Sequence, residues 1–244
     1  MAKNWKILVP DKSEIESLSQ ELGISKFLAW LLLNRGIREA KSARRFLSFG
    51  IEDLANNSGL DFFVSAGEFL ARAIISKRRI GIHGDYDVDG ITATALLVEF
   101  LSAIGVRAEY YLPHRLQDGY GLSLAGVEEL AKRGVNFLIA VDCGITDFES
   151  VERAKQLGME VLILDHHQPW DRLPNADLIL DPHTQEGAPS ELKELCSAGL
   201  VFFVLLQVRR ILREKKFFDK RSEPNLKQLL DLVALGTVAD VAPV

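Results

Sequence analysis

The sequence predicts an α/β fold, a parallel sheet flanked by helices, preceded by a small helical N-terminal region. Two observations predict it. From residue 79 onward, apolar runs of strand length alternate with amphipathic segments of helix length, the pattern of right-handed βαβ units. Before residue 79, helix caps and glycines divide the chain into short helices with no strand pattern. We therefore expect a helical region over residues 1–78 and an α/β domain over residues 79–244.

The N-terminal region is expected to hold four helices. Ser13 and Ser25 are good N-caps for the first two, because a serine hydroxyl accepts a hydrogen bond from a free backbone N–H group. The third carries Lys41, Arg44 and Arg45 on its polar side, which is more typical of a solvated face than of a nucleic-acid contact. The fourth has the pattern of a helix that packs on the domain that follows. In chain order the four cover residues 13–22, 26–34, 38–49 and 65–76.

The α/β domain is expected to alternate five strands with helices. The strands are predicted at residues 79–84, 106–112, 136–141, 161–164 and 178–180, and the helices at 92–103, 123–133, 148–157, 198–212 and 226 to about 238. A run of cations from Arg209 to Arg221 follows the apolar centre of the fourth helix. The run is either a nucleic-acid contact or the solvated end of a helix, where cations are favoured.

Composition indicates an ordinary globular protein. The 244 residues are 48% hydrophobic and 26% charged, which is enough to bury a substantial core. No apolar run reaches the ~18 residues of a membrane span, and the first five residues do not start a signal peptide. We therefore expect a cytoplasmic monomer with no membrane contact. The two cysteines, Cys143 and Cys196, fit neither a metal spacing nor a disulfide framework and are expected to be reduced.

The net charge of −5 is unevenly distributed. Residues 1–79 hold 13 Lys and Arg against 9 Asp and Glu, and residues 80–244 hold 16 against 25. Bound cations at an acidic site would offset part of this excess, so the net charge excludes no class of partner.

Three aspartates stand at alternate positions directly after the first predicted strand. If the segment is extended, Asp85, Asp87 and Asp89 share one face, and their charges need a cation. Oxygen ligands suit Mg²⁺ or Mn²⁺, and the imidazole of His83 leans toward Mn²⁺. A calcium loop would need a glutamate at the position of Leu96. A solvated acidic turn is the other alternative.

Further candidate ligands follow other strands. Asp142 follows the third strand, and Asp165, His166 and His167 follow the fourth. Because the carboxyl ends of parallel strands meet at one edge, these residues would join the first motif in one cleft. Taken alone, Asp142 could instead cap a helix. Together the residues suit two divalent ions ~3.5–4 Å apart with one bridging aspartate, which implies phosphoester hydrolysis. No glycine-rich nucleotide loop or serine-nucleophile motif indicates another chemistry.

Four segments resemble the motifs of the DHH phosphoesterase superfamily, and within it the RecJ family of single-strand-specific 5′→3′ exonucleases. They cover residues 83–90, 141–145, 165–167 and 235–243, and residues 31–37 and 112–122 are also similar to that family. The resemblance implies that residues 79–244 form a DHH catalytic domain with two Mn²⁺ or Mg²⁺ ions. It also implies release of 5′-mononucleotides from single-stranded DNA in DNA repair and recombination, with a helicase and a single-strand-binding protein as possible partners.

The same resemblance implies a role for each candidate residue. Metal ligands would be His83 and Asp87 at one ion, Asp89, His166 and Asp240 at the other, and Asp142 between them. Catalytic residues would be Asp87, Asp142 and His167, which faces the scissile phosphate. The substrate would contact Arg115, Tyr120 and His167. Asp85 and Asp165 would support the ligands, Asp165 by orienting His166 or its neighbourhood.

Two other functions stay open. One is a DHH phosphodiesterase that acts on oligoribonucleotides or cyclic dinucleotides, and the other is an inert replication scaffold with the same fold. The segments at residues 183–188 and 196–199 depart from the RecJ pattern, which leaves details of the substrate open. The chain ends directly after an apolar motif, without the second, DNA-gripping domain of that family, so we expect a fragment.

Overall fold

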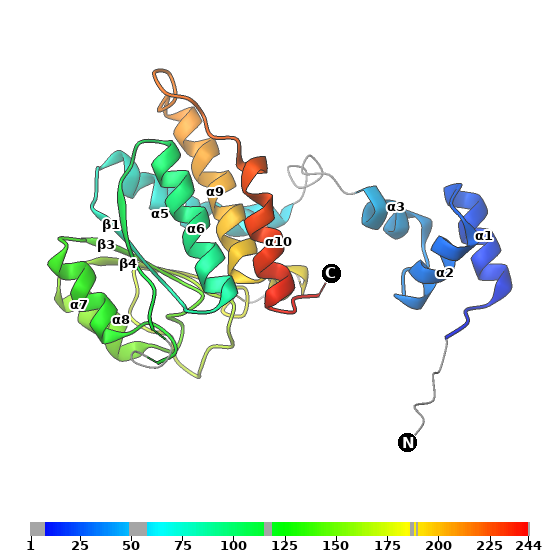
Figure 1. Ribbon diagram of the computed structural model, residues 1–244, viewed down its shortest axis with the longest axis horizontal. Helices are drawn as coiled ribbons and strands as arrows, with labels where there is room; N and C mark the ends of the chain where they lie inside the picture. The colour runs from blue at the N-terminus through cyan, green and yellow to red at the C-terminus, as the bar shows by residue number, and fades with distance from the viewer. Residues whose placement is uncertain (1–7, 49–57, 115–118, 186–187, 189, 244) are drawn as a thin grey trace. The chain divides into compact units, whose positions relative to one another are not determined.

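The computed structural model describes residues 8–48, 58–114, 119–185, 188 and 190–243. The chain divides into two compact units, Met1–Asn57 and Ser58–Val244 (Figure 1). The predicted boundary after residue 78 marks the start of the strand pattern. The second unit starts earlier, because helix α5 (Val64–Ile75) packs against helix α9 (Ser197–Glu214) of the same unit.

The first unit consists of helices α1 (Lys12–Leu22), α2 (Lys26–Asn34) and α3 (Ala40–Ser48). Ser25 caps α2, as predicted, and accepts a hydrogen bond from the N–H of Leu28 at 3.2 Å. Ser13 does not cap α1. Asp11 caps it instead, with its Oδ1 accepting from the N–H of Ser13 at 2.8 Å, because aspartate is as good a cap as serine and stands two residues earlier. The predicted end of the third helix, Phe49, lies outside the described residues. The core of this unit contains Leu18, Ala29, Leu32, Leu33 and Ala43.

The second unit is built on a parallel sheet with the strand order β2-β1-β3-β4-β5. Its strands are β1 (Ile80–Gly84), β2 (Ala108–Tyr111), β3 (Phe137–Val141), β4 (Glu160–Leu164) and β5 (Leu178–Leu180). The remaining helices are α6 (Val88–Ala103), α7 (Leu124–Lys132), α8 (Phe148–Gln156) and α10 (Leu230–Ala239), with short 3₁₀ turns at η1 (Ser58–Phe63), η2 (Ser190–Glu194) and η3 (Leu226–Leu229). All five predicted strands are present, which confirms the predicted α/β class.

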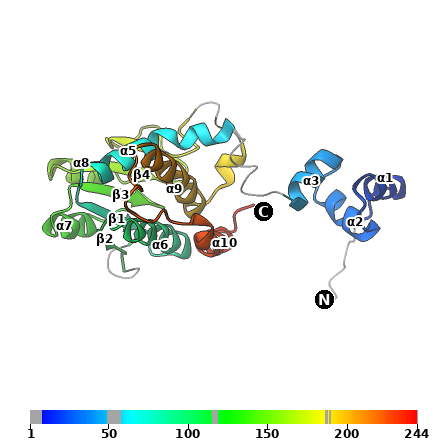
Figure 2. The same ribbon diagram turned by 90° about the horizontal axis from the view of Figure 1, so that it is seen from above.

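Helices cover both faces of the sheet. Along β3, Phe137, Ile139 and Val141 face the core under α5, α6 and α9, whereas Leu138 and Ala140 face the core under α7 and α8. Figures 1 and 2 show these two helical layers with the sheet between them. Burial on both faces explains why the strands are almost continuously apolar in sequence.

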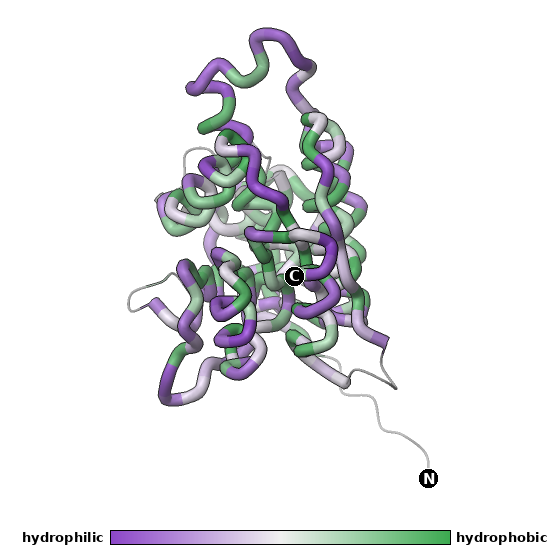
Figure 3. The backbone as a smooth tube through the Cα atoms, turned by 90° about the vertical axis from the view of Figure 1, so that its left-hand side faces the viewer, coloured by the Kyte–Doolittle hydropathy of each residue, from purple (hydrophilic) through white to green (hydrophobic). Residues whose placement is uncertain are grey.

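The cations between Arg209 and Arg221 lie at the C-terminal end of α9. Arg209 and Arg213 pair with Glu223, and Arg210 pairs with Glu214. The connection that follows α9 is largely polar and lies at the top of Figure 3. The 18 residues of α9 separate its two ends by about 27 Å. Of the two alternatives left by the sequence, the structure favours the solvated helix end. No helix within the described ranges is long and apolar enough to cross a membrane.

Candidate metal centre

The predicted acidic and histidine residues meet at the carboxyl edge of the sheet. Within the described ranges, three sets of side chains each bring their ligand atoms within 4.8 Å of one another. The sets are Asp85, Asp87 and Asp142; Asp142, His166 and His167; and Asp89, His166 and Asp240. Asp142 belongs to the first two of these sets, and His166 belongs to the last two. The residues therefore form one continuous centre with room for more than one ion.

The start of α6 divides the first motif between two sets. Asp87 is the N-cap of α6, and its Oδ1 accepts a hydrogen bond from the N–H of Gly90 at 3.0 Å. The helix therefore begins at Val88, and Asp89 lies in its first turn. The expectation that Asp85, Asp87 and Asp89 share one face of an extended segment is wrong, because aspartate at position 87 caps a helix readily. The turn directs Asp85 and Asp87 toward Asp142, and Asp89 toward His166.

Asp89 is held by the N-terminus of α9. Its Oδ1 accepts from the N–H of Ala198 at 2.9 Å, and its Oδ2 accepts from the N–H of Ser197 at 2.6 Å. Free N–H groups at a helix N-terminus stabilise an anion, so this carboxylate keeps its place although it is only 2% exposed. The sequence motifs did not identify Ser197, because the contact between α9 and α6 forms only in the folded chain and leaves no sequence pattern.

A glycine brings Asp240 to the centre. A Cβ atom at Gly236 would lie 2.7 Å from Thr92 Oγ1 and 2.8 Å from Asp89 Oδ1. Only a residue without a side chain lets α10 approach α6 this closely. Asp240, the C-cap of α10, then has its Oδ2 at 3.9 Å from His166 Nδ1.

Asp142 lies between the sets and is 1% exposed. Its Oδ1 accepts a hydrogen bond from Ser197 Oγ at 3.0 Å and lies 3.2 Å from His166 Nε2. Its φ of 62° is in the left-handed region, and such strained residues cluster at functional sites. The pKa of Asp142 is raised to about 10, chiefly because its carboxyl is buried and secondly because of the charges of Asp89 and Asp87. The alternative that Asp142 caps a helix is wrong, because the next helix starts at Phe148.

Several polar atoms of the centre have unused bonding capacity. The Oδ2 atoms of Asp85 and Asp142 are buried, and neither has a hydrogen-bond partner in the described part of the chain. His166 Nε2 is also buried and makes no hydrogen bond of good geometry there, despite its 3.2 Å approach to Asp142 Oδ1. Unpaired buried polar atoms are costly. Carboxylate oxygens with one imidazole are a suitable donor set for Mn²⁺ or Mg²⁺, so the residues fit divalent ions.

His167 is held between two partners. Its Nδ1 lies 2.7 Å from Asp165 Oδ1, and its Nε2 lies 2.7 Å from the hydroxyl of Tyr120. The hydrogen bond to Asp165 raises the pKa of His167, although burial partly opposes it. Asp165 also accepts from the N–H of Ile145 at 3.1 Å. The carboxylate therefore orients the ring of His167, within the neighbourhood of His166 that the family resemblance indicated.

Asp147 holds the segment that carries Tyr120. Its Oδ2 accepts hydrogen bonds from the N–H groups of Leu122 and Gly144, both at 2.9 Å. A Cβ at Gly121, whose φ is +88°, would lie 2.8 Å from Asp147 Oδ1. The carboxylate thus joins the Tyr120 segment to the loop after β3. The sequence analysis missed Asp147, for which the only signal was an acidic residue in the same loop as Asp142.

His83 belongs to none of the three sets of ligand atoms found among the described residues. It is fully buried, with Nε2 at 3.2 Å from Ser123 Oγ and Nδ1 at 3.9 Å from Cys143 Sγ. Ile80 and Ile82 face the core under α6, and strand alternation therefore turns His83 to the α7 side. This predicted ligand is therefore in none of the three sets, and its role as a ligand stays a prediction.

Arg115 and Asp181 are two further residues that follow predicted strands in the sequence. Arg115, a predicted substrate contact, lies outside the described residues. Asp181, which the sequence analysis missed, follows β5 and is 0% exposed. Its Oδ1 accepts from the N–H of His183 at 2.7 Å. Burial, with a contribution from the charge of Asp165, raises the pKa of Asp181 to about 7. The same rule that found Asp142 and Asp165, an acid at the carboxyl end of a strand, could have found it.

The fold and the site together define an α/β domain with a multi-carboxylate metal centre at the carboxyl edge of its sheet. The chain belongs to the DHH family: the pattern described as "DHH family, N-terminal domain" matches residues 79–237. This match confirms the family resemblance that the four motifs indicated.

Relatives with the name single-stranded-DNA-specific exonuclease RecJ are similar over most of the chain. The protein of Salmonella typhimurium is 42% identical over 217 residues, which are 87% of this chain and 37% of that protein. The protein of Bacillus subtilis is 33% identical over 239 residues, which are 98% of this chain and 29% of that protein. The chain thus spans only about a third of the length of these relatives.

Solved structures agree with the fold. Exonuclease RecJ bound to manganese matches with a TM-score of 0.63 and 34% identity, covering 74% of this chain and 43% of that one. RecJ from Thermus thermophilus in complex with Mn²⁺ matches with a TM-score of 0.71 and 27% identity, covering 97% of this chain and 32% of that one.

Proposed function

We propose that this chain is the catalytic part of a metal-dependent exonuclease that degrades single-stranded DNA from the 5′ end and releases 5′-mononucleotides. The observation that carries the proposal is the linkage of the three ligand sets through Asp142 and then His166, together with the unpaired buried oxygens of Asp85 and Asp142. The names of the relatives support the substrate class, and the manganese in related structures supports the metal.

The overlap suggests how two Mn²⁺ or Mg²⁺ ions would be held. Asp85 and Asp87 would hold one ion, Asp89, His166 and Asp240 would hold the other, and Asp142 would bridge them. When bound, such ions lower the pKa of an attacking water and stabilise charge on the phosphate. Asp85 thus joins the ligands in this proposal, and His83 packs behind them.

The residues around the ions have their own tasks. Asp165 accepts a hydrogen bond from the Nδ1–H group of His167. The Nε2 atom is then directed at Tyr120 and the substrate side. Because Asp165 raises the pKa of His167, the ring is protonated more readily. A protonated Nε2 can donate to a phosphate oxygen or to the leaving oxygen. Tyr120 is 59% exposed and could also contact the substrate.

Degradation of this kind needs a supply of single strands. A helicase and a single-strand-binding protein are therefore the partners that we propose, in DNA repair and recombination, with the chain acting as a monomer in the cytoplasm. The competing scaffold function requires loss of metal ligands, whereas three overlapping ligand sets are present here.

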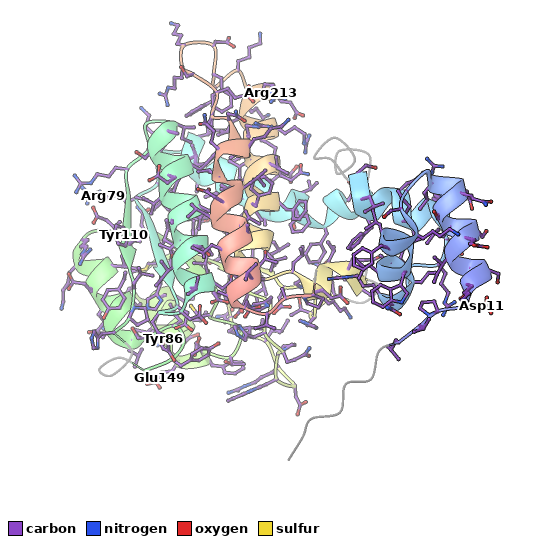
Figure 4. All side chains as sticks on the ribbon, turned by 45° about the vertical axis from the view of Figure 1, so that its right-hand side comes forward. Asp11, Arg79, Tyr86, Tyr110, Glu149 and Arg213 are labelled. Atoms are coloured by element: carbon purple, nitrogen blue, oxygen red, sulfur yellow. The ribbon has the colours of Figure 1, made fainter. Side chains whose placement is uncertain are left out.

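Digestion of end-labelled single strands with Mn²⁺ tests the proposal. We expect a strand labelled at its 5′ end to lose the label as a mononucleotide early, and a strand labelled at its 3′ end to shorten progressively. The Asp142→Asn variant keeps the size of the side chain but has no carboxylate to bridge two ions, and it should be inactive. Glu149→Gln, at an exposed position on α8 (Figure 4), is the matched control and should be active.

Two results would contradict the proposal. Cleavage of two-nucleotide RNA without action on longer DNA would favour the oligoribonucleotide phosphodiesterase. Failure of the folded chain to bind any divalent ion would favour the scaffold.

A further inference from the structure

Four arginines surround a pocket at the amino-terminal edge of the sheet, away from the metal centre. The pocket has a volume of about 340 Å³, and its lining includes Arg78, Arg79, Arg107 and Arg133. This volume lies within the ~300–1,000 Å³ typical of small-molecule sites. Figure 4 shows Arg79, which precedes β1, and Tyr86, which follows it, well apart.

Three separate segments bring these cations together. Arg78 and Arg79 directly precede β1, Arg107 directly precedes β2, and Arg133 is the C-cap of α7 ahead of β3. Parallel strands begin at the same edge of a sheet, so side chains at the starts of the strands lie close together. The ligands of the metal centre lie close together at the opposite edge for the same reason. The cluster is therefore a product of the fold.

Three glutamates pair with three of the four arginines and leave Arg79 without a carboxylate partner among the described residues. Glu109 is the only carboxylate in the lining of the pocket within the described part of the chain, and it lies at 3.5 Å from Arg107 and 3.7 Å from Arg133. Both distances exceed those of a good ionic hydrogen bond. Arg78 pairs with Glu160 at 3.0 Å, and Arg133 with Glu129 at 3.0 Å. These two acids do not line the pocket.

Unused donors remain in the pocket. Among the residues that the structure describes, no carboxylate lies within the 4.0 Å ion-pair distance of the Arg79 guanidinium. Arg78 is less available, because its Nη2 donates to Asn136 O at 3.0 Å and pairs with Glu160 and its Nε is buried. The lining thus combines four arginines with one carboxylate, and the guanidinium of Arg79 is free to donate. Three of the four cations are paired with Glu160, Glu109 and Glu129. An anion in the pocket would therefore bind chiefly to Arg79, with Arg107 beside it.

We propose that this pocket binds a phosphate group, carried either by a free nucleotide or by the backbone of single-stranded nucleic acid. Guanidinium groups donate paired hydrogen bonds to phosphate oxygens, and converging guanidinium groups share its charge. The site is separate from the metal centre, because the five residues of β1 place the two edges about 17 Å apart.

Binding of two probes to the metal-free chain tests this. With a chelator present, calorimetry with deoxyadenosine 5′-monophosphate and with a short oligothymidylate reports phosphate binding without the contribution of bound metal. We expect Arg79→Ala to weaken binding by about tenfold, the loss of one charge-assisted contact. Arg79→Lys keeps the charge but not the paired donors. Its affinity for the probes should lie between those of the native chain and of Arg79→Ala. Arg153→Ala removes an arginine of α8 that pairs with Glu128 and should leave binding unchanged.

The two probes distinguish the sources of the phosphate. Arginine-dependent binding of the mononucleotide would identify a nucleotide site, and binding of the oligonucleotide alone would identify a contact to the nucleic-acid backbone. If Arg79→Ala does not fold, Arg107→Ala gives the same test, since the side chain of Arg107 is 90% exposed. The Asp142→Asn variant should bind both probes as the native chain does, even if the proposed hydrolysis fails. Binding of neither probe, or equal binding by the native chain and the arginine variants, would overturn the proposal.

Discussion

His167 shows how one residue can be assigned a role from its hydrogen bonds. Its Nδ1 contacts Asp165 and its Nε2 contacts Tyr120, both at 2.7 Å. His166 has no such partner for its Nε2 within the described ranges and lies 3.2 Å from the Asp142 carboxylate. We therefore propose different tasks for the two adjacent imidazoles, His167 acting on the substrate and His166 on a metal ion.

We expect His167→Ala to lower kcat by about 10²–10⁴-fold, the usual contribution of a general acid or base. Its affinity for Mn²⁺, measured by calorimetry, should stay close to that of the native chain. The matched variant is His166→Ala, which should lose Mn²⁺ affinity. If the Mn²⁺ site disappears in His167→Ala instead, the roles of the two histidines are reversed.

Asp181 makes stability depend on pH. Its pKa in the folded chain is about 7, against an ordinary value of 3.8. Between these values the folded chain retains a proton that the unfolded chain has lost, so the free energy of unfolding falls as pH rises from about 4 to about 7 and then levels off. Asp181→Asn cannot ionise. It should therefore gain stability relative to the native chain across this window, by on the order of 4 kcal/mol.

Denaturant unfolding of the metal-free chain near pH 5 and near pH 8 measures this difference. The Asn variant should be more stable than the native chain chiefly at the higher pH. A constant difference between the two proteins at both values would show that Asp181 ionises normally in the folded chain.

Among the elements, the loop after β3 and the segment before α7 are joined by one carboxylate. Asp147 accepts two backbone hydrogen bonds, one from each segment. We expect Asp147→Ala to release the Tyr120 segment and raise KM for single-stranded DNA by about tenfold, because positioning accounts for much of substrate recognition. Mn²⁺ affinity should change little, since Asp147 is not part of the ligand sets found in the described residues.

The conservative variant Asp147→Asn is the control, because its amide oxygen can still accept both hydrogen bonds. It should restore a KM close to that of the native chain. Equal KM values for Asp147→Ala and the native chain would show that the segment keeps its position without this carboxylate.

The elements also show how far the sequence could predict the site. Asp142, Asp165 and His166 were found because the carboxyl ends of parallel strands share one edge. The start of α6 was missed, because Asp87 can belong to an extended segment or cap a helix and only the folded chain decides between them. His83 was predicted as a ligand from its imidazole and from family resemblance, and this stays a prediction, because alternation with Ile82 along the strand turns its side chain to the α7 side of the sheet.

At the scale of the molecule, the sheet of the second unit carries opposite charges at its two edges. Carboxylates gather at the carboxyl edge, and arginines gather at the amino edge. Without bound cations the carboxylate edge repels a phosphate. Under the proposed function, metal binding should therefore precede substrate binding at that edge, whereas phosphate binding in the proposed arginine pocket should need no metal. The rate of DNA hydrolysis should accordingly rise in proportion to the fraction of chains that have bound metal.

Electron paramagnetic resonance of the Mn²⁺-bound chain tests whether Asp142 would join two metal ions, as the proposed hydrolysis requires. Ions about 3.5–4 Å apart that share a carboxylate should give an exchange-coupled spectrum, distinct from that of isolated Mn²⁺. We expect this spectrum, together with DNA hydrolysis, in the native chain, and we expect both to be lost in Asp142→Asn. A spectrum of isolated ions in an active native chain, or hydrolysis that survives in Asp142→Asn, would contradict the account.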